Sequence, residues 1–243
     1  MIADIRTMMW KELREIMIYG GGRGKAGLLI FVVGIGVFLP LQMGRDWIKS
    51  PIMLFLGVWM PLALVISVVA DSFAGERERH TLETLLASRL SDRAILCGKA
   101  GAAMAYGVGA SWVILLLGLV TVNLAHGHGK PIFFSATMGF STIGFSLLNA
   151  GLATSAGILV SLRAATVRQA QQTLSIVLMA FLFGGIFSIQ ALPAEWKDSL
   201  VKTFTAVGVE RALAFMALIL TVLDVGLFAW AMKRFRRSRL IFD

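Results

Sequence analysis

Apolar residues in this chain gather into long, almost uninterrupted runs, and polar residues fall mainly between the runs. A helix needs about 20 mostly apolar residues to cross a lipid bilayer. Six stretches approach or exceed this length, at residues 26–43, 51–70, 100–125, 132–162, 173–192 and 212–232. The pattern predicts an all-α, polytopic membrane protein with six transmembrane helices in a single domain over residues 1–243. Residue Pro61 falls inside the second stretch, where we expect a kink.

The first 25 residues have a different pattern, with acids and bases throughout. This argues against a cleavable signal peptide, which needs an apolar core. Apolar residues from Ile2 to Met17 recur near a helical period, and Lys11, Glu12, Arg14 and Glu15 lie between them. We predict an N-terminal helix over residues 1–25 at the membrane interface, while a helix that only packs on its neighbours would show the same pattern.

Composition agrees with a membrane protein: 57% of the residues are hydrophobic and 15% are charged, against roughly 25% charged in soluble domains. The single cysteine, Cys97, excludes an intrachain disulfide. The net charge of +9 is typical of basic cytoplasmic loops in such a protein and does not predict nucleic-acid binding.

Lysine and arginine are distributed unevenly between the two sides that six spans would define. Seventeen of the 23 lie in the N-terminal segment, the loops after the second and fourth spans, and the C-terminal tail. Six lie in the other three loops. Because positive charge is retained on the cytoplasmic side, we expect both termini to be cytoplasmic. We expect the protein to lie in a prokaryotic inner membrane.

The most charged part of the chain is the segment after the second span, where residues 71–93 carry a dense mixture of acids and bases. Leu82, Leu85 and Leu86 recur at helical spacing, and Thr81 and Ser91 are suited to cap helices. We expect a short amphipathic helix here. It would either dock a soluble partner or simply connect two spans.

The order of residues in this segment resembles the signature of ABC-2 type exporter permeases (type V fold). Gly75-Glu76-Arg77-Glu78, then Thr81-Leu82-Glu83-Thr84-Leu85-Leu86 and Gly98-Lys99, are similar to the family pattern GExExGTLExLLxxP followed by GK. Trp10-Lys11-Glu12-Leu13 fits the family's N-terminal helix. Two departures are Arg79-His80, where the family has a glycine in second place, and Arg89-Leu90, where proline is frequent.

The resemblance implies that the segment is a coupling helix, which sits in a cleft of a cytoplasmic ATPase and transmits movement to the membrane. The residues that match the motif, and to which it assigns ATPase coupling, are Gly75, Glu76, Arg77, Glu78, Thr81, Leu82, Glu83 and Leu86. We expect the leucines to fill the cleft, and Gly75 to allow a tight turn.

The ATPase should be another polypeptide, because neither Gly24-Lys25 nor Gly98-Lys99 fits a phosphate-binding loop. The resemblance therefore implies two copies of an ABC ATPase that hold ATP and Mg²⁺, with no cofactor in this chain. It also implies a second permease, either an identical copy or a related chain, in a lipid membrane.

Other residues that could bind a ligand or a metal ion give weaker signals. His126 and His128 flank a glycine after the third span, but no third metal ligand is near in sequence, and we predict no metal site. Asp224 lies in the middle of the sixth span, and Asn149 is among several polar residues of the fourth. Either residue could line a transport pathway, or form a buried polar contact between helices.

Two other functions would need different residues. An ion-coupled secondary transporter would need charges near the midplane, which Asp224 alone provides. An intramembrane serine protease would need a histidine base within the membrane, but His80, His126 and His128 all fall outside the cores of the spans.

Overall fold

The computed structural model describes residues 1–19, 22–50, 52–127 and 129–235, and this part of the chain contains helices and no strand. The all-α prediction is confirmed. The helices in chain order are α1 (Ile2–Tyr19), α2 (Gly22–Val33), the π-helical η1 (Gly34–Phe38), α3 (Leu39–Met43), α4 (Asp46–Lys49), α5 (Ile52–Glu78), α6 (Leu82–Ala87), α7 (Asp92–His126), α8 (Ala136–Ser161), α9 (Val167–Ala191), α10 (Ala194–Val207) and α11 (Val209–Arg234).

Five helices are long and apolar enough to cross a membrane: α5, α7, α8, α9 and α11. They correspond to the second through sixth predicted spans, so the chain is an integral, multi-pass membrane protein. The first predicted span is formed by α2, η1 and α3 together, and its apolar part, Leu29–Met43, is shorter. A sixth crossing of the membrane stays a prediction.

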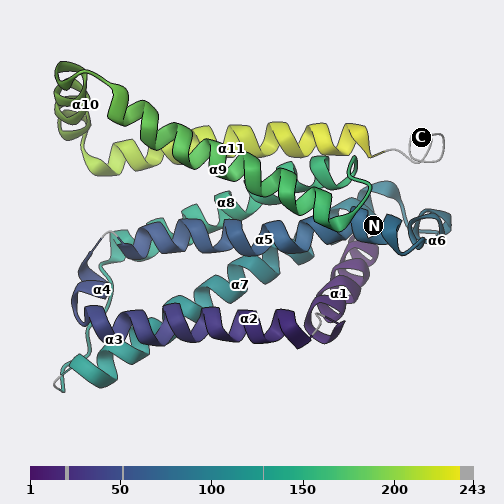
Figure 1. Ribbon diagram of the computed structural model, residues 1–243, viewed down its shortest axis with the longest axis horizontal. Helices are drawn as coiled ribbons and strands as arrows, with labels where there is room; N and C mark the ends of the chain where they lie inside the picture. The colour runs from purple at the N-terminus through teal and green to yellow at the C-terminus, as the bar shows by residue number, and fades with distance from the viewer. Residues whose placement is uncertain (20–21, 51, 128, 236–243) are drawn as a thin grey trace.

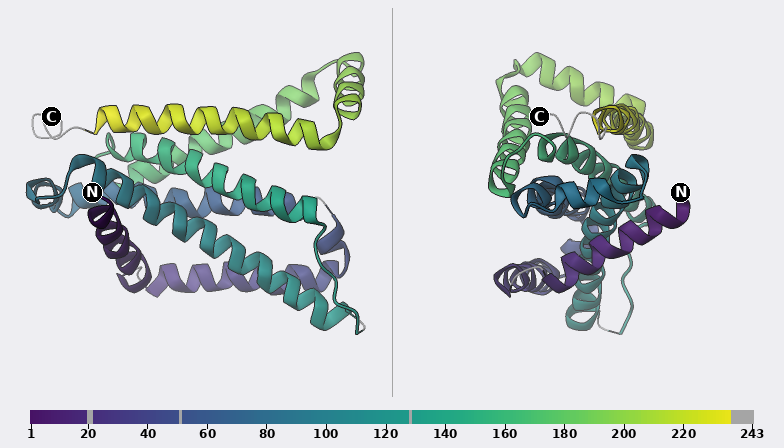
Figure 2. Two further views of the ribbon diagram at one scale, coloured as in Figure 1. Left: turned by 180° about the vertical axis from the view of Figure 1, so that it is seen from behind. Right: turned by 90° about the vertical axis from the view of Figure 1, so that its right-hand side faces the viewer.

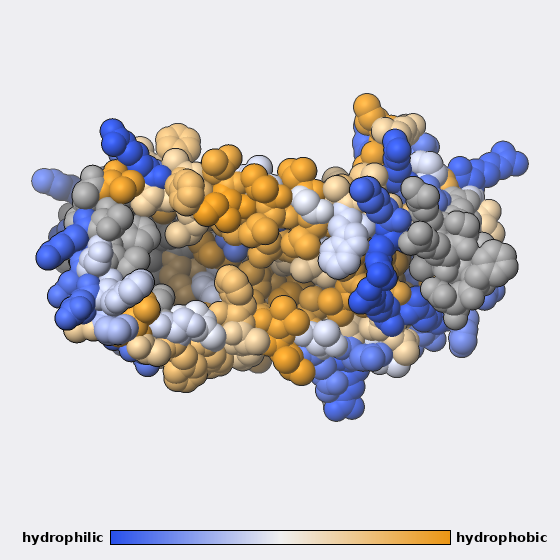
Figure 3. All heavy atoms as spheres, turned by 90° about the horizontal axis from the view of Figure 1, so that it is seen from above, coloured by the Kyte–Doolittle hydropathy of each residue, from blue (hydrophilic) through white to orange (hydrophobic). Residues whose placement is uncertain are grey.

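The long helices lie side by side along the long axis of the molecule (Figure 1). Helices α1 and α6 lie at one end, and α3, α4 and α10 lie at the other, as the view from behind also shows (Figure 2). A space-filling view from above shows a broad apolar band across the middle of the face, with hydrophilic residues towards both ends (Figure 3). This is the surface expected of a protein whose middle is surrounded by lipid.

Helix α5 is longer than the hydrophobic pattern predicts, because it continues from Ala70 through the charged residues to Glu78. Gly75 therefore lies within a helix, and the prediction of a tight turn at this residue is wrong. A Cβ at Gly75 would lie 2.0 Å from Oδ1 of Asp71, and Asp71 pairs with Arg79 at 3.1 Å. The ion pair therefore lies directly against Gly75, and a side chain at this position would displace it.

Small residues allow the central helices to pack closely. A Cβ at Gly107 of α7 would lie 2.3 Å from Cγ2 of Val65 in α5, and a Cβ at Gly157 of α8 would lie 2.5 Å from Cγ1 of Val69. Close approach of this kind is how membrane helices gain van der Waals contact where no hydrophobic effect drives them together. Helix α5 is thus held between α7 and α8.

We predict that Gly107→Ala destabilises the protein by about 1–3 kcal/mol, because the new methyl group must displace the β-branched Val65. Gly109 offers a control on the same helix, since a Cβ there meets no other atom within 4 Å. Thermal unfolding in a neutral detergent should show a lower midpoint for Gly107→Ala than for Gly109→Ala. Equal midpoints would contradict the close packing of α5 on α7.

Candidate functional site: a charged junction at one end of the bundle

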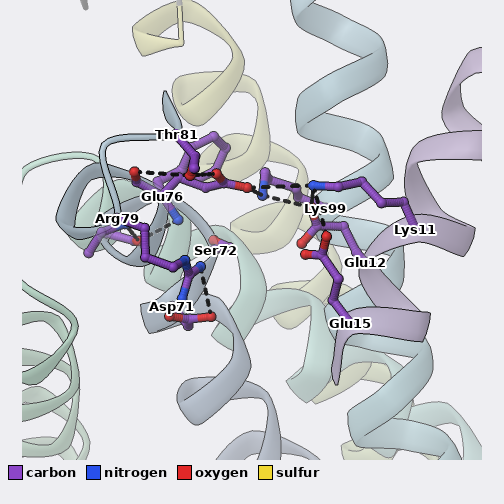
Figure 4. Close-up of polar contacts among 12 residues, drawn as sticks. Lys11, Glu12, Glu15, Asp71, Ser72, Glu76, Arg79, Thr81 and Lys99 are labelled. Atoms are coloured by element: carbon purple, nitrogen blue, oxygen red, sulfur yellow. Dashed lines mark hydrogen bonds and ion pairs between the residues drawn. The ribbon is translucent and has the colours of Figure 1, made fainter. Parts of the chain in front are cut away.

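A buried lysine occupies the end of the bundle where α1 and α6 lie. The side chain of Lys99, in α7, is only 1% exposed. Its Nζ atom lies 2.8 Å from Oε1 of Glu12 in α1 and 3.3 Å from Oε1 of Glu76 in α5, as Figure 4 shows. The Lys99 ammonium also lies 5.5 Å from the centre of the Phe73 ring. One cation therefore connects three helices.

A second lysine lies at the rim of this group. Lys11 Nζ is 3.2 Å from Glu15, 3.6 Å from Glu12 and 3.7 Å from Glu76. Partial burial opposes its charge, but the carboxylates of Glu12, Glu15 and Glu76 outweigh burial and hold the pKa of Lys11 above its usual value. We call Lys11, Glu12, Glu76 and Lys99 the charged junction.

The two residues after Glu76 fasten other parts of the chain. Arg77 donates hydrogen bonds to the carbonyl oxygens of Ala164 (2.6 Å) and Leu162 (2.9 Å), just beyond the end of α8. The Oε2 atom of Glu78 accepts from the backbone N–H of Val167 at 3.1 Å, at the start of α9. A carboxylate at a helix N-terminus and a guanidinium at a C-terminus both complement the helix dipole. The end of α5 thus contacts α1, α7, α8 and α9.

Helix α6 is attached to α5 by a short turn. Thr81 precedes it, and its hydroxyl donates to the Glu76 carboxylate rather than capping α6 as predicted. Ser91 does cap the next helix as predicted, accepting from the backbone N–H of Ala94 at 3.3 Å. The turn includes His80 at φ 57°, the only residue other than glycine with a positive φ in the described part of the chain.

The residue His80 takes the place of the glycine in the family pattern, and its backbone keeps the left-handed conformation that glycine favours.

We expected the leucines of α6 to fill a cleft of the ATPase, but the first of them, Leu82, faces the interior of this chain. Leu82 is 9% exposed and packs in the central hydrophobic core, so it anchors α6 to the chain. The exposed residues of α6 and its flanks are Thr81, Glu83, Thr84, Ala87 and Arg89. The side chain of Leu86 lies outside the described part of the structure.

The polar residues predicted within the membrane lie on two helices in contact, α8 and α11. Asn149 is buried and donates to the Phe145 carbonyl at 2.8 Å, within its own helix. A Cβ at Gly151 of α8 would lie 2.7 Å from Oδ2 of Asp224. The Oδ1 atom of Asp224 is buried without a hydrogen-bond partner among the described residues. Asp224 thus faces α8 and not lipid alone.

At the other end of the bundle, the His126 carbonyl accepts from Nε of Arg45 at 3.2 Å. His128 lies outside the described residues. Within the described ranges, no three histidine, cysteine, aspartate or glutamate residues are grouped to hold a metal ion.

The sequence model of the family described as "ABC-2 type transporter" matches residues 5–203. The chain belongs to the ABC-2 type transporter family. The match includes most of α1, all four residues of the charged junction, and α6.

A curated relative is the "ABC transporter permease protein NatB" of Bacillus subtilis, which is 25% identical over 170 residues, or 65% of this chain. The matched region spans 44% of the length of that relative.

Sequence reasoning singled out the three motifs of the charged junction, but it did not predict that they meet. Glu12 and Lys99 are 87 residues apart, and no periodic pattern links them. The sequence signal for the pairing was Lys99 itself, a lysine near the start of an apolar helix. A lysine in this position is costly to bury unless a carboxylate pairs with it.

We predict that Lys99→Met destabilises the protein by about 3–5 kcal/mol, because it removes the buried cation and leaves the carboxylates of Glu12 and Glu76 with only the longer contacts to Lys11. Lys11→Met is the matched control, and it should cost about 1 kcal/mol or less because Lys11 is 45% exposed. Adding Glu12→Gln and Glu76→Gln to Lys99→Met should restore part of the loss. Thermal unfolding in detergent tests the series, and equal effects of the two lysine variants would refute the junction.

We predict that His80→Gly stabilises the protein by roughly 0.5–1 kcal/mol, because glycine adopts φ 57° without the steric cost that a side chain brings. Arg79→Gly should instead destabilise, since Arg79 has a pairing partner in Asp71 and is not at a positive φ. Unfolding midpoints of the two variants should move in opposite directions. A lower midpoint for His80→Gly would show that the His80 side chain itself matters.

Proposed function

We propose that this chain is the membrane-spanning permease subunit of an ATP-driven exporter and that residues 75–88 couple it to a separate ATPase. The observation that carries the proposal is the position of the motif. Its first half lies in the end of α5, where it contacts four other helices, and its second half forms α6, which projects from the same end of the molecule (Figure 1).

The contacts of the motif divide its residues into two groups. Glu76, Arg77 and Glu78 have partners within the chain, whereas Glu83 is exposed on α6. In the proposed mechanism, the exposed group contacts the ATPase. The inner group transmits displacement of α6 to α1 and α7 through Glu76, and to the α8–α9 turn through Arg77 and Glu78.

A six-residue helix is well suited to this role because it cannot be stable alone. Its position depends on Leu82 in the core and on the Thr81–Glu76 hydrogen bond. Movement imposed on α6 must therefore displace α5 or break these contacts.

The proposed assembly has two ATPase subunits, which hold ATP and Mg²⁺, and two permeases, as identical copies or with a related chain. The termini would be cytoplasmic in a prokaryotic inner membrane. The basis is the excess of lysine and arginine in the segments at the α6 end, which include α1, the α5–α7 connection and the α8–α9 turn.

We predict that Glu83→Arg with Ala87→Arg reduces recovery of the ATPase with the tagged permease by about tenfold or more. The reason is that reversed and added charge on an exposed face opposes docking of a complementary surface. The measurement is copurification of the ATPase, with ATP hydrolysis measured in proteoliposomes.

The matched control is Glu195→Arg with Ala194→Arg in α10, since these two residues are also exposed and lie at the opposite end of the molecule. It should recover the ATPase like the unmodified chain. If the α6 variant retains the ATPase and its coupled hydrolysis, α6 is a connector and the proposed function fails.

A further inference from the structure

A groove with a volume of about 380 Å³ lies where the ends of α8 and α11 meet the start of α9. Two arginines line it, Arg163 just after α8 and Arg234 at the last residue of α11. Trp230 lies one turn before Arg234 on α11, and the Arg234 guanidinium is 5.9 Å from its ring centre. Leu159 and Leu227 form part of the apolar wall.

The lining changes from charged to apolar along the helix axes. On α11, Arg234 is followed inward by Trp230 and then Leu227, which lies about 10 Å deeper at a rise of 1.5 Å per residue. On the other wall, Arg163 is followed inward by Val160 and Leu159. The groove is therefore cationic at the end of the bundle and apolar towards the middle of the membrane-spanning region.

Charge at the mouth of the groove is of one sign. No acidic residue is among the described residues that line it, and neither arginine forms an ion pair within the described ranges. Guanidinium groups match phosphate geometry with two parallel hydrogen bonds. Tryptophan is typical of the headgroup level of a bilayer.

The surroundings of the groove determine which molecule reaches it. The apolar stretches of α9 and α11 are 11% and 0% buried within the chain, and the apolar band of Figure 3 is the surface that lipid would cover. Phospholipid is therefore present at high local concentration. Basic pockets between membrane helices select anionic headgroups.

We propose that this groove binds an anionic phospholipid, with the phosphate between Arg163 and Arg234 and an acyl chain along Leu159 and Leu227. The bound lipid would contact the α8–α9 turn, the same turn whose carbonyls accept hydrogen bonds from Arg77. Lipid occupancy would thus stabilise the attachment of α5 to α8. The proposal does not depend on the ATPase or on the direction of transport.

The test uses the full chain in neutral detergent with an equimolar mixture of phosphatidylglycerol and phosphatidylcholine, and native mass spectrometry counts each lipid retained. The unmodified chain should retain phosphatidylglycerol in preference. The preference should fall by roughly fivefold for each arginine removed, so Arg163→Gln with Arg234→Gln should abolish it. The ratio of the two lipids is the readout, so a general loss of lipid does not mimic the result.

The control variant is Arg89→Gln with Arg168→Gln, which removes two exposed charges from the same end of the molecule. Neither of these arginines lines the groove. It should keep the preference. An excess of soluble glycerol phosphate should not displace the lipid, because it lacks an acyl chain. Displacement by glycerol phosphate, or an unchanged lipid ratio in the Arg163 and Arg234 variant, would overturn the proposal.

Discussion

The ammonium group of Lys99 is the constraint on which this end of the molecule depends. A cation that is 1% exposed is stable only if carboxylates reach it in good geometry, and the two that do so, Glu12 and Glu76, come from different helices. Helices α1 and α5 must therefore meet α7 at this point. Because Glu76 is fixed, the next residues Arg77 and Glu78 are brought to the α8–α9 turn.

The glycine beside Lys99 makes this arrangement possible. A Cβ at Gly98 would lie 2.5 Å from Cβ of Met8 and 3.2 Å from the Ile5 carbonyl oxygen, so α1 lies directly against α7. Met8 and Glu12 lie one turn apart on the same face of α1. Gly98 and Lys99, which contact them, are consecutive residues of α7. Close contact at the glycine places the Glu12 carboxylate beside the lysine. Gly98 thus allows α1 to approach α7 closely, and Lys99 forms the ion pair with Glu12.

Hydropathy and capping predicted five of the spans and the Ser91 cap, because these features depend on residues close in sequence. They did not predict that α5 continues to Glu78, since helix hydrogen bonds extend beyond the apolar stretch. The turn that the family resemblance led us to expect at Gly75 is absent, because α5 continues through this residue. The inward position of Leu82 and the pairing of Glu12 with Lys99 depend on tertiary contacts, which periodicity does not report. The motifs quoted for the family resemblance contain Glu12, Glu76 and Lys99, but the resemblance did not predict that these residues pair with one another.

The charged junction and α6 are connected through the carboxylate of Glu76. The carboxylate of Glu76 accepts from Lys99 and also from Thr81, the residue that precedes α6. A displacement of α6 that weakens the Thr81 contact changes the hydrogen bonding of the carboxylate that neutralises Lys99. Thr81 and Lys99 contact different oxygens of this carboxylate, so both bonds form at once. Through the Glu76 carboxylate, the buried charge of Lys99 is thus connected to the residue that precedes α6 as well as to α1 and α5.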